Sequence, residues 1–262
     1  MTSIVFDITT QNVAEIKQEI KQLTRKQNSA YGLLIALGLI GLWAISLILL
    51  LSIHLDQFPV WLIPPAILWQ MFLYTGLFIT AHDAMHGAVY LQSAKVNHFL
   101  GALAVTCYGL FSYRELLEKH WLHHRYPASD QDPDFHDGEH NHPVRWYFYF
   151  ISRYWKWKQL IGLTLVYILL HQILHVPQNN LTLFWVAPSV LSSVQLFYFG
   201  TFLTHNEPSE GFKNSHRART NPLPIFWSFI TCYHFGYHEE HHEHPSVAWW
   251  QLPTVHRLHR SC

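Results

Sequence analysis

The chain has 262 residues, of which half are hydrophobic and only 13% are charged. That charged share is about half of the share in ordinary soluble proteins, which indicates a protein of the lipid bilayer. Lysine and arginine number 17, as do aspartate and glutamate, so no basic excess favours a nucleic-acid partner. Cys107, Cys232 and Cys262 are few, scattered and odd in number, which fits a reducing compartment and argues against a disulfide framework.

The amino terminus is polar, with Lys17, Lys21, Arg25 and Lys26 spread over an amphiphilic stretch. A secretory signal would instead show a short apolar core followed by small residues at a cleavage site. We therefore expect no removable signal peptide.

Four uncharged runs are long enough to cross hydrocarbon, since a transmembrane helix needs about 17 to 25 residues. They cover residues 31–53, 59–81, 160–176 and 181–204. Two further uncharged runs, 96–113 and 221–237, are about as long as the shortest of these. Lys95 and Arg114 bracket the first of the two, and Arg219 precedes the second. Because Lys and Arg collect on the cytoplasmic side, we expect these two runs to be interfacial or re-entrant.

Four spans give a consistent charge distribution. The far-side loops read SIHLDQF and PQNN and contain no Lys or Arg, so all 17 basic residues fall on one face. The sequence therefore predicts an all-α integral membrane protein with four transmembrane helices in two hairpins and both termini cytosolic. We expect one domain, residues 1–262, with a cytosolic cap from residues 82–158 and 205–262. A soluble all-helical protein is the alternative, which the low charge and the long apolar runs disfavour.

Histidines crowd the predicted cytosolic face in three groups. They read HDAMH over residues 82–86, HWLHH over residues 120–124 and HEEHH over residues 238–242. Residues three and four apart share a helix face, so each group aims its imidazoles in one direction, as metal ligation requires. A single H-x-x-x-H would be weak evidence, but the three groups together predict a metal site in the cap.

The number of histidines predicts two metal ions, because zinc sites, for comparison, are usually four-coordinate. The candidate ligands in the three groups are His82, His86, His120, His123, His124, His238, His241 and His242. His205, in THNEP at the end of the fourth span, could supply a ninth ligand or could bond to backbone at the interface. His234 is a reserve ligand, which shares a face with His238 if that helix extends backward.

Acidic neighbours matter because a metal-bound histidine usually gives its other N–H to a carboxylate or a carbonyl. Residues placed for this orienting role, or equally for a solvated position, are Asp83, Glu118, Glu239, Glu240 and Glu243. The acidic, proline-flanked stretch DQDPDFHDGEHNHP, residues 130–143, reads as a solvated loop.

The histidine pattern leaves several chemistries open. HEEHH contains the H-E-x-x-H signature of zinc proteases, but a membrane peptidase would leave the histidines of the other two groups without a role. A metal transporter would need ligands inside the spans, where only His171 and His175 lie. Imidazole-rich sites suit zinc, copper, iron or nickel. A membrane location favours an apolar substrate and C–H oxidation, for which two irons, with O2 as co-substrate, fit best.

HDAMHG, HWLHHRYP and HEEHHEHP resemble the three histidine boxes of the membrane fatty-acid desaturase and hydroxylase superfamily. The flanking residues, the short length and FGTFLTHNEP most resemble the bacterial-type beta-carotene ketolases. The resemblance runs from about residue 30 to the carboxyl end. It implies iron ligation at the eight box histidines, and His205 is similar to the extra histidine that this superfamily often contributes between its second and third boxes.

The resemblance also implies a reaction. Such ketolases convert C4 of the beta-ionone ring of beta-carotene to a carbonyl by two hydroxylations and loss of water, giving echinenone or canthaxanthin. Each round uses O2 and two electrons from an outside donor such as ferredoxin, for which the basic residues of GFKNSHRART are a candidate docking face. No catalytic residue beyond the metal ligands is required, and an apolar groove would set specificity. A carotenoid ring hydroxylase and a fatty-acyl desaturase or hydroxylase remain as alternatives.

Overall fold

The computed structural model describes residues 16, 18–22 and 29–260, and this part of the chain is helical, with no β-strand. The predicted all-α class is therefore confirmed for it. Cys262 and the predicted cytosolic amino terminus, including Lys17, Arg25 and Lys26, lie outside the described residues. In chain order the helices are α2 (Ser29–Ser52), η1 (Val60–Leu62), α3 (Ile63–Met85), α4 (Ala94–Gly109), α5 (Tyr113–Arg125), α6 (Pro143–Tyr154), α7 (Trp157–Ile168), η2 (Leu169–Ile173), α8 (Gln178–Leu181), η3 (Thr182–Val186), α9 (Ala187–Leu196), η4 (Phe197–Phe202), α10 (Leu203–His205), α11 (Ile225–Cys232), α12 (His238–Glu243), η5 (Trp249–Gln251) and α13 (Leu252–Arg260).

Three helical segments in the described part are long and apolar enough to cross a membrane: Ala30–Ser52, Val60–Met85 and Gln178–His205. They correspond to the first, second and fourth predicted spans. The third predicted span, residues 160–176, is occupied by α7 and the π-helical turn η2 and is not among these three segments. A fourth crossing therefore remains a prediction.

The segment Gln178–His205 is one helix with two widened π-helical turns, η3 and η4. The first of these turns precedes Pro188, which lies at the beginning of α9. Proline has no backbone N–H and its ring clashes with the carbonyl four residues earlier. The widened turn accommodates Pro188 without breaking the helix, and such turns occur frequently at functional sites.

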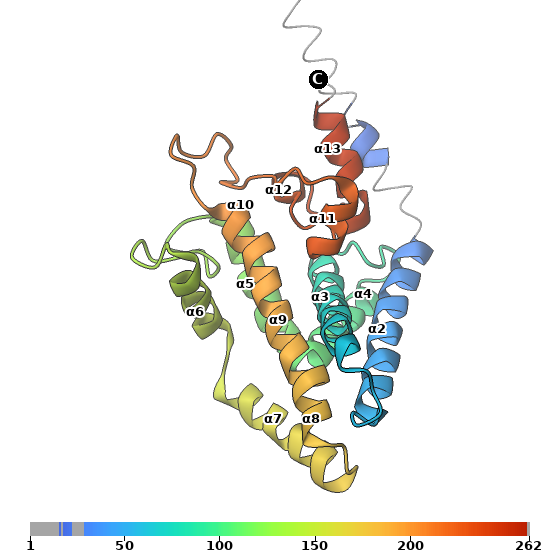
Figure 1. The fold of residues 1–262 in the computed structure, drawn as a ribbon. Coiled ribbons are helices and arrows are strands. Elements are labelled where there is room, and N and C mark those ends of the chain that lie inside the picture. The colour runs from blue at the N-terminus through green and yellow to red at the C-terminus, as the bar shows by residue number, and fades with distance from the viewer. Residues whose placement is uncertain (1–15, 17, 23–28, 261–262) are drawn as a thin grey trace, which may run out of the picture.

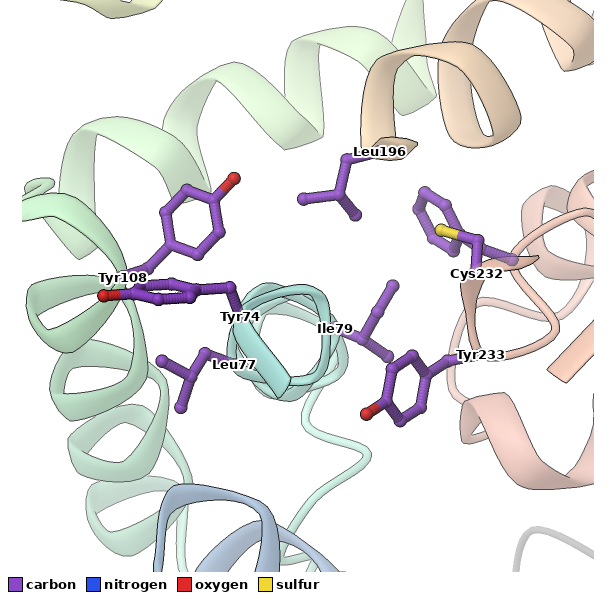
Figure 2. Packing of buried hydrophobic residues seen from close by; sticks show 8 residues of the cluster. Tyr74, Leu77, Ile79, Tyr108, Leu196, Cys232 and Tyr233 are labelled. Atoms are coloured by element: carbon purple, nitrogen blue, oxygen red, sulfur yellow. The ribbon is translucent and has the colours of Figure 1, made fainter. Parts of the chain in front are cut away.

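Helix α3 is the centre of the bundle and packs against α2, α4 and α9 (Figure 1). Tyr74, Leu77 and Ile79 of α3 are fully buried, and Figure 2 shows them surrounded by side chains of α4, α9 and α11. Each large apolar side chain buried in this way stabilises the fold by about 1.5–3 kcal/mol. The packing fixes α3, and with it the histidines at its carboxyl end.

Gly76 allows α11 to approach α3 closely. A Cβ atom at Gly76 would lie 2.7 Å from the Tyr233 hydroxyl oxygen, and that hydroxyl donates a hydrogen bond to the carbonyl of Phe72 over 3.1 Å. The residues that follow α11 lead directly into α12, so this contact also positions the third histidine box. Helices α11, α12 and α13 gather at the same end of the bundle as α10 (Figure 1).

Candidate metal centre

Each histidine box lies at a defined point of the fold. His82 and His86 lie at the carboxyl end of α3, the second box lies on α5, and the third box makes up most of α12. Helix α5 begins at the N-cap Ser112, whose hydroxyl accepts a hydrogen bond from the backbone N–H of Glu115. His205 ends α10 and therefore lies at the same end of the bundle as α12.

The structure brings all nine predicted histidines into two groups, in each of which one nitrogen per ring lies within 4.8 Å of the others. The first group, which we call the five-histidine group, contains His82, His86, His120, His124 and His241. The second, the four-histidine group, contains His123, His205, His238 and His242. Adjacent residues of the second and third boxes are thus divided between the two groups.

The nitrogen separations fit metal ligation. The Nε2 atoms of His123 and His242 are 3.1 Å apart, and those of His124 and His241 are also 3.1 Å apart. Two imidazole nitrogens on one metal ion, each at about 2.1 Å from it, lie roughly 3 Å apart. The Nε2 atoms of His82 and His205 are buried and have no hydrogen-bond partner. A buried, unpartnered nitrogen costs free energy, which a bound metal ion would offset, so these residues fit two metal ions.

In two of the histidines, the ring nitrogen Nδ1, which faces away from the metal position, is bound by a carboxylate or a backbone carbonyl. The Nδ1–H of His123 donates to Asp132, with both carboxylate oxygens at 3.0 Å. The backbone N–H groups of Ala128 and Asp134 donate to the same carboxylate over 2.8 Å each. The Nδ1–H of His205 donates to the carbonyl of Arg217 over 2.8 Å. Fixing Nδ1 in this way directs Nε2 toward the metal position.

Of the predicted orienting carboxylates Asp83, Glu118, Glu239 and Glu240, only Asp83 contacts a box histidine. The Nδ1 of His82 lies 3.3 Å from Asp83 Oδ1, and Asp83 Oδ2 accepts a hydrogen bond from the backbone N–H of Trp249. Glu118 is exposed and pairs with Arg114. The other two glutamates are bound elsewhere, Glu239 by Asn214 and Glu240 by His256 and Thr220.

Asp132 is the orienting residue that sequence reasoning missed. Its side chain is buried, although it belongs to the stretch 130–143 that the sequence predicted to be a solvated loop. An acidic residue shortly after a histidine box was the available signal. It was hidden by the neighbouring acidic residues of the same stretch, which look equivalent in sequence.

His234 lies outside both groups. The helix of the third box begins at His238, and the backbone at His234 is left-handed, with φ of 62°. The backward extension of α12 that would place His234 on the face of His238 is therefore absent. Its Nδ1 lies 3.2 Å from the hydroxyl oxygen of Ser228.

Burial keeps several box histidines in the neutral form that binds metals. It lowers the pKa of His120, His238 and His241 well below the usual value, and the neighbouring imidazoles add to this effect. Burial also lowers the pKa of His123, but Asp132 and Asp134 outweigh it and raise the pKa to about 9. His120, His238 and His241 are thus neutral and available as ligands near pH 7, whereas His123 is the exception.

An apolar cavity of about 620 Å³ leads to both groups. His82, His120, His123 and His238 line it, and between α7 and α9 it extends to Tyr167 and Trp185. Along the helix Gln178–His205 it reaches from Val186 to Thr201, roughly 20 Å at a rise of 1.5 Å per residue. Three of the lining residues are also exposed on the outside of the molecule, which indicates an opening between α7 and α9: Leu160, Val186 and Val190.

Comparisons with known proteins agree with this arrangement. The family model described as "Fatty acid desaturase" matches residues 59–171 and 151–262. The chain is 39% identical over 244 residues to a protein named beta-carotene ketolase from Paracoccus sp. (strain N81106 / MBIC 01143), covering 89% of this chain and 95% of that one. It is 42% identical over 196 residues to beta-carotene 4-ketolase 3 from Haematococcus lacustris, covering 71% and 60%. It is 38% identical over 225 residues to zeaxanthin 4-ketolase from Chlamydomonas reinhardtii, covering 84% and 50%.

Proposed function

The chain belongs to the fatty acid desaturase family, and we propose that it is an oxidoreductase of that family that acts as a carotenoid ketolase. The relatives named as beta-carotene ketolases and the long apolar cavity together support this assignment. The observation that carries the mechanism is the division of nine histidines into two groups at the end of that cavity. An alternative within the same family is a carotenoid ring hydroxylase, which would share the site and the first product.

The two groups would hold two iron ions, with His82, His86, His120, His124 and His241 around one and His123, His205, His238 and His242 around the other. Bound iron would supply the activation of O2 that the oxidation of the allylic C–H bond at C4 requires. The protein contributes the fixed orientation of the imidazoles. Asp132 and the carbonyl of Arg217 hold the outer nitrogens of His123 and His205, and Asp83 lies beside His82.

The cavity selects an elongated apolar substrate and positions one end of it. A beta-ionone ring at the histidine end would lie against Phe235, whose ring packs on both His82 and His238 with centroid distances of 4.6 and 5.1 Å. The polyene would follow the part of the cavity that the helix Gln178–His205 lines from Thr201 to Val186. The first hydroxylation at C4 gives an alcohol, and the second gives a gem-diol that loses water to the ketone. The apolar walls exclude water from the reacting carbon.

A four-span topology is consistent with the two groups. His86 follows α3 and belongs to the five-histidine group. His205 ends the segment Gln178–His205 and belongs to the adjacent four-histidine group. The chain must therefore return to the opposite side between residues 86 and 178, and α7 with η2 is the segment that could make this crossing. Its exposed apolar side chains support a position in lipid: Leu160, Ile161, Leu165, Ile168, Leu169 and Ile173. We infer one domain, residues 1–262, with two hairpins, cytosolic termini and a cytosolic cap from residues 82–158 and 205–262.

The reaction requires electrons from outside the site. Two electrons are needed for each O2, and we infer an external acidic carrier such as ferredoxin as their source. The bilayer would supply the carotenoid, since the cavity opens between two apolar helices.

Expression in cells that accumulate beta-carotene, followed by chromatography with mass detection, tests the function. A pigment in which a ring CH2 has become C=O is the expected product. A pigment that has gained only a hydroxyl group would make the protein a hydroxylase, and unchanged pigment beside altered acyl chains would make it a lipid desaturase. His120→Ala removes a proposed ligand. Its matched control is His140→Ala, which alters a partly exposed histidine that pairs with Asp137.

A further inference from the structure

One exposed aromatic side chain contacts the five-histidine group. Trp121 of α5 is 45% exposed, and its ring centroid lies 5.2 Å from that of His86 at an interplanar angle of 75°. The same indole lies 5.8 Å from His124. In the described part of the chain, Trp121 is the only exposed large aromatic residue with a ring contact to either group. It therefore joins the protein surface to two of the proposed metal ligands.

The indole lies at the centre of a mixed surface. Arg114, Glu118, Leu122 and Arg125 are exposed and share its side of α5, because they lie one, two or three helical turns from one another. Leu122 is 41% exposed. The side chains of Arg114 and Glu118 form an ion pair that is open to solvent. Trp121 thus has an apolar neighbour and charged residues around it.

A second basic segment borders this surface. The guanidinium of Arg217 donates to the carbonyl of Ala128 over 2.9 Å, which ties the loop around Arg217 to the turn after α5. Lys213 and Arg219, also in that loop, are exposed. Lys213 pairs with Glu210 and Arg219 donates to the carbonyl of Asn206, so Arg125 and Arg217 are the exposed cations at the carboxyl end of α5. An apolar centre containing tryptophan and a charged rim are typical of protein interfaces.

The proposed reaction gives this surface a use. Each hydroxylation breaks one C–H bond and the O–O bond, places one oxygen atom in the product as a hydroxyl group and releases the other as water. Two electrons and two protons complete that balance. The histidines of the four-histidine group are buried, and those of the five-histidine group are at most partly accessible. Electrons from a carrier protein therefore need a path from the surface to these histidines, and Trp121 is an exposed side chain that contacts two of them.

We propose that the surface formed by Trp121, Leu122, Arg125 and Arg217 docks an acidic one-electron carrier protein, and that electrons reach His86 and His124 through Trp121. This inference rests on the proposed function, because it assumes redox-active metal ions in the two groups. A positive rim accelerates and orients the encounter with an acidic partner.

The test uses the full chain, loaded with iron in lipid nanodiscs, and a plant-type [2Fe–2S] ferredoxin as the probe. Two quantities are measured without carotenoid: the dissociation constant for ferredoxin, and the rate at which reduced ferredoxin is reoxidised by the protein. The variants are Trp121→Ala and Arg125→Glu. Trp157→Ala is the control, since Trp157 is 81% exposed and is not one of the residues that contact the histidines.

We expect Arg125→Glu to weaken ferredoxin binding about tenfold, the order of effect of reversing one charge in an interface. Trp121→Ala should slow ferredoxin reoxidation strongly while the protein keeps its iron and its reduction by dithionite. Trp157→Ala should match the unaltered chain in both measurements. Unchanged binding and reoxidation in the two test variants would overturn the proposal, as would loss of iron in Trp121→Ala, which would make the indole a packing residue.

Two further outcomes are informative. The fluorescence of Trp121 is the difference in emission between the unaltered chain and Trp121→Phe. If brominated lipids quench this fluorescence, the face contacts the bilayer and the docking surface is rejected. Rapid reoxidation of ferredoxin that depends on Trp121, without ketone formation from beta-carotene, would keep the docking surface and reject the proposed function. The two hypotheses can therefore fail separately.

Discussion

The imidazole of His123 is held by Asp132, a buried carboxylate nine residues further along the chain, with Nδ1 3.0 Å from both carboxylate oxygens. The opposite nitrogen of the same ring lies 3.1 Å from His242. One carboxylate thus fixes the direction of a proposed ligand from the four-histidine group.

Asp132→Asn should weaken metal binding at the four-histidine group, because the neutral amide orients and polarises His123 less well. Loss of such an orienting partner typically costs 10- to 100-fold in metal affinity. Iron titration of the purified protein checks this result. Asp130→Asn changes an exposed aspartate two residues away and should have no effect, so equal losses in the two variants would contradict the orienting role.

His205→Ala should remove iron from the four-histidine group and reduce ketone formation far more than His216→Ala. His205 is buried and lies within that group, whereas His216 lies outside it with its ring 6.0 Å from that of His242. Iron content per chain and product formation are the measurements. Equal effects of the two substitutions would count against a ninth ligand.

Val190→Trp should lower the turnover of beta-carotene without loss of iron. Val190 lines the cavity and is 53% exposed, so an indole there would narrow the opening between α7 and α9. Val194→Trp, one turn further along the same helix at a position that is 42% exposed, is the control. The rate of product formation at several beta-carotene levels is measured for both variants. Similar rates in Val190→Trp and Val194→Trp would show that the substrate enters elsewhere.

Gly76→Ala should destabilise the fold, because the added methyl group would meet the Tyr233 hydroxyl. Overpacking of this kind costs about 1–3 kcal/mol. Thermal unfolding in detergent measures the change. Gly41→Ala, where nothing lies within 4 Å, should be neutral or slightly stabilising. A Gly76→Ala protein as stable as the Gly41→Ala protein would refute the close approach of α11.

Acid should destabilise the metal-free protein. Burial lowers the pKa of His120, His238 and His241 below the value of 6.5 that applies to the unfolded chain. Below about pH 6.5 the unfolded state therefore binds more protons, and stability falls as the pH decreases.

His123 has the opposite effect, because its pKa is raised to about 9. Its contribution to stability is complete below pH 6.5 and is lost as the pH rises through about 9. Thermal unfolding measured from pH 5 to pH 10 should therefore show maximum stability between these limits. Unfolding temperatures that do not change between pH 7.5 and pH 5 would contradict the buried neutral histidines.

The sequence was most informative where one local pattern determined the result. Uninterrupted apolar runs predicted α2, α3 and the helix Gln178–His205, and the spacing of the boxes predicted which histidines come together. Neither pattern could reveal which histidines form which group. Neighbours on a helix point about 100° apart, so His123 and His124 face different groups, and the partners of each depend on how α3, α5 and α12 meet.

Orienting residues were harder to predict, because they depend on loops and on the rotation of helices. Glu118 lies near the second box in sequence, but the face of α5 that carries it also carries Arg114 and is turned toward solvent. Asp132 reaches His123 only through the fold of the following loop, in which backbone N–H groups of Ala128 and Asp134 hold the carboxylate. No periodicity distinguishes it from Asp130 or Asp137.

The division of adjacent histidines between the two groups has a consequence for assembly. Helices α5 and α12 each contribute to both groups, so a rotation of either helix disturbs both sets of nitrogens at once. An ion that fixes one helix would thereby pre-order the remaining ligands for its neighbour and reduce the conformational entropy lost on the second binding event. Loading of the proposed pair should consequently be cooperative, with little of the singly occupied form at intermediate metal concentrations.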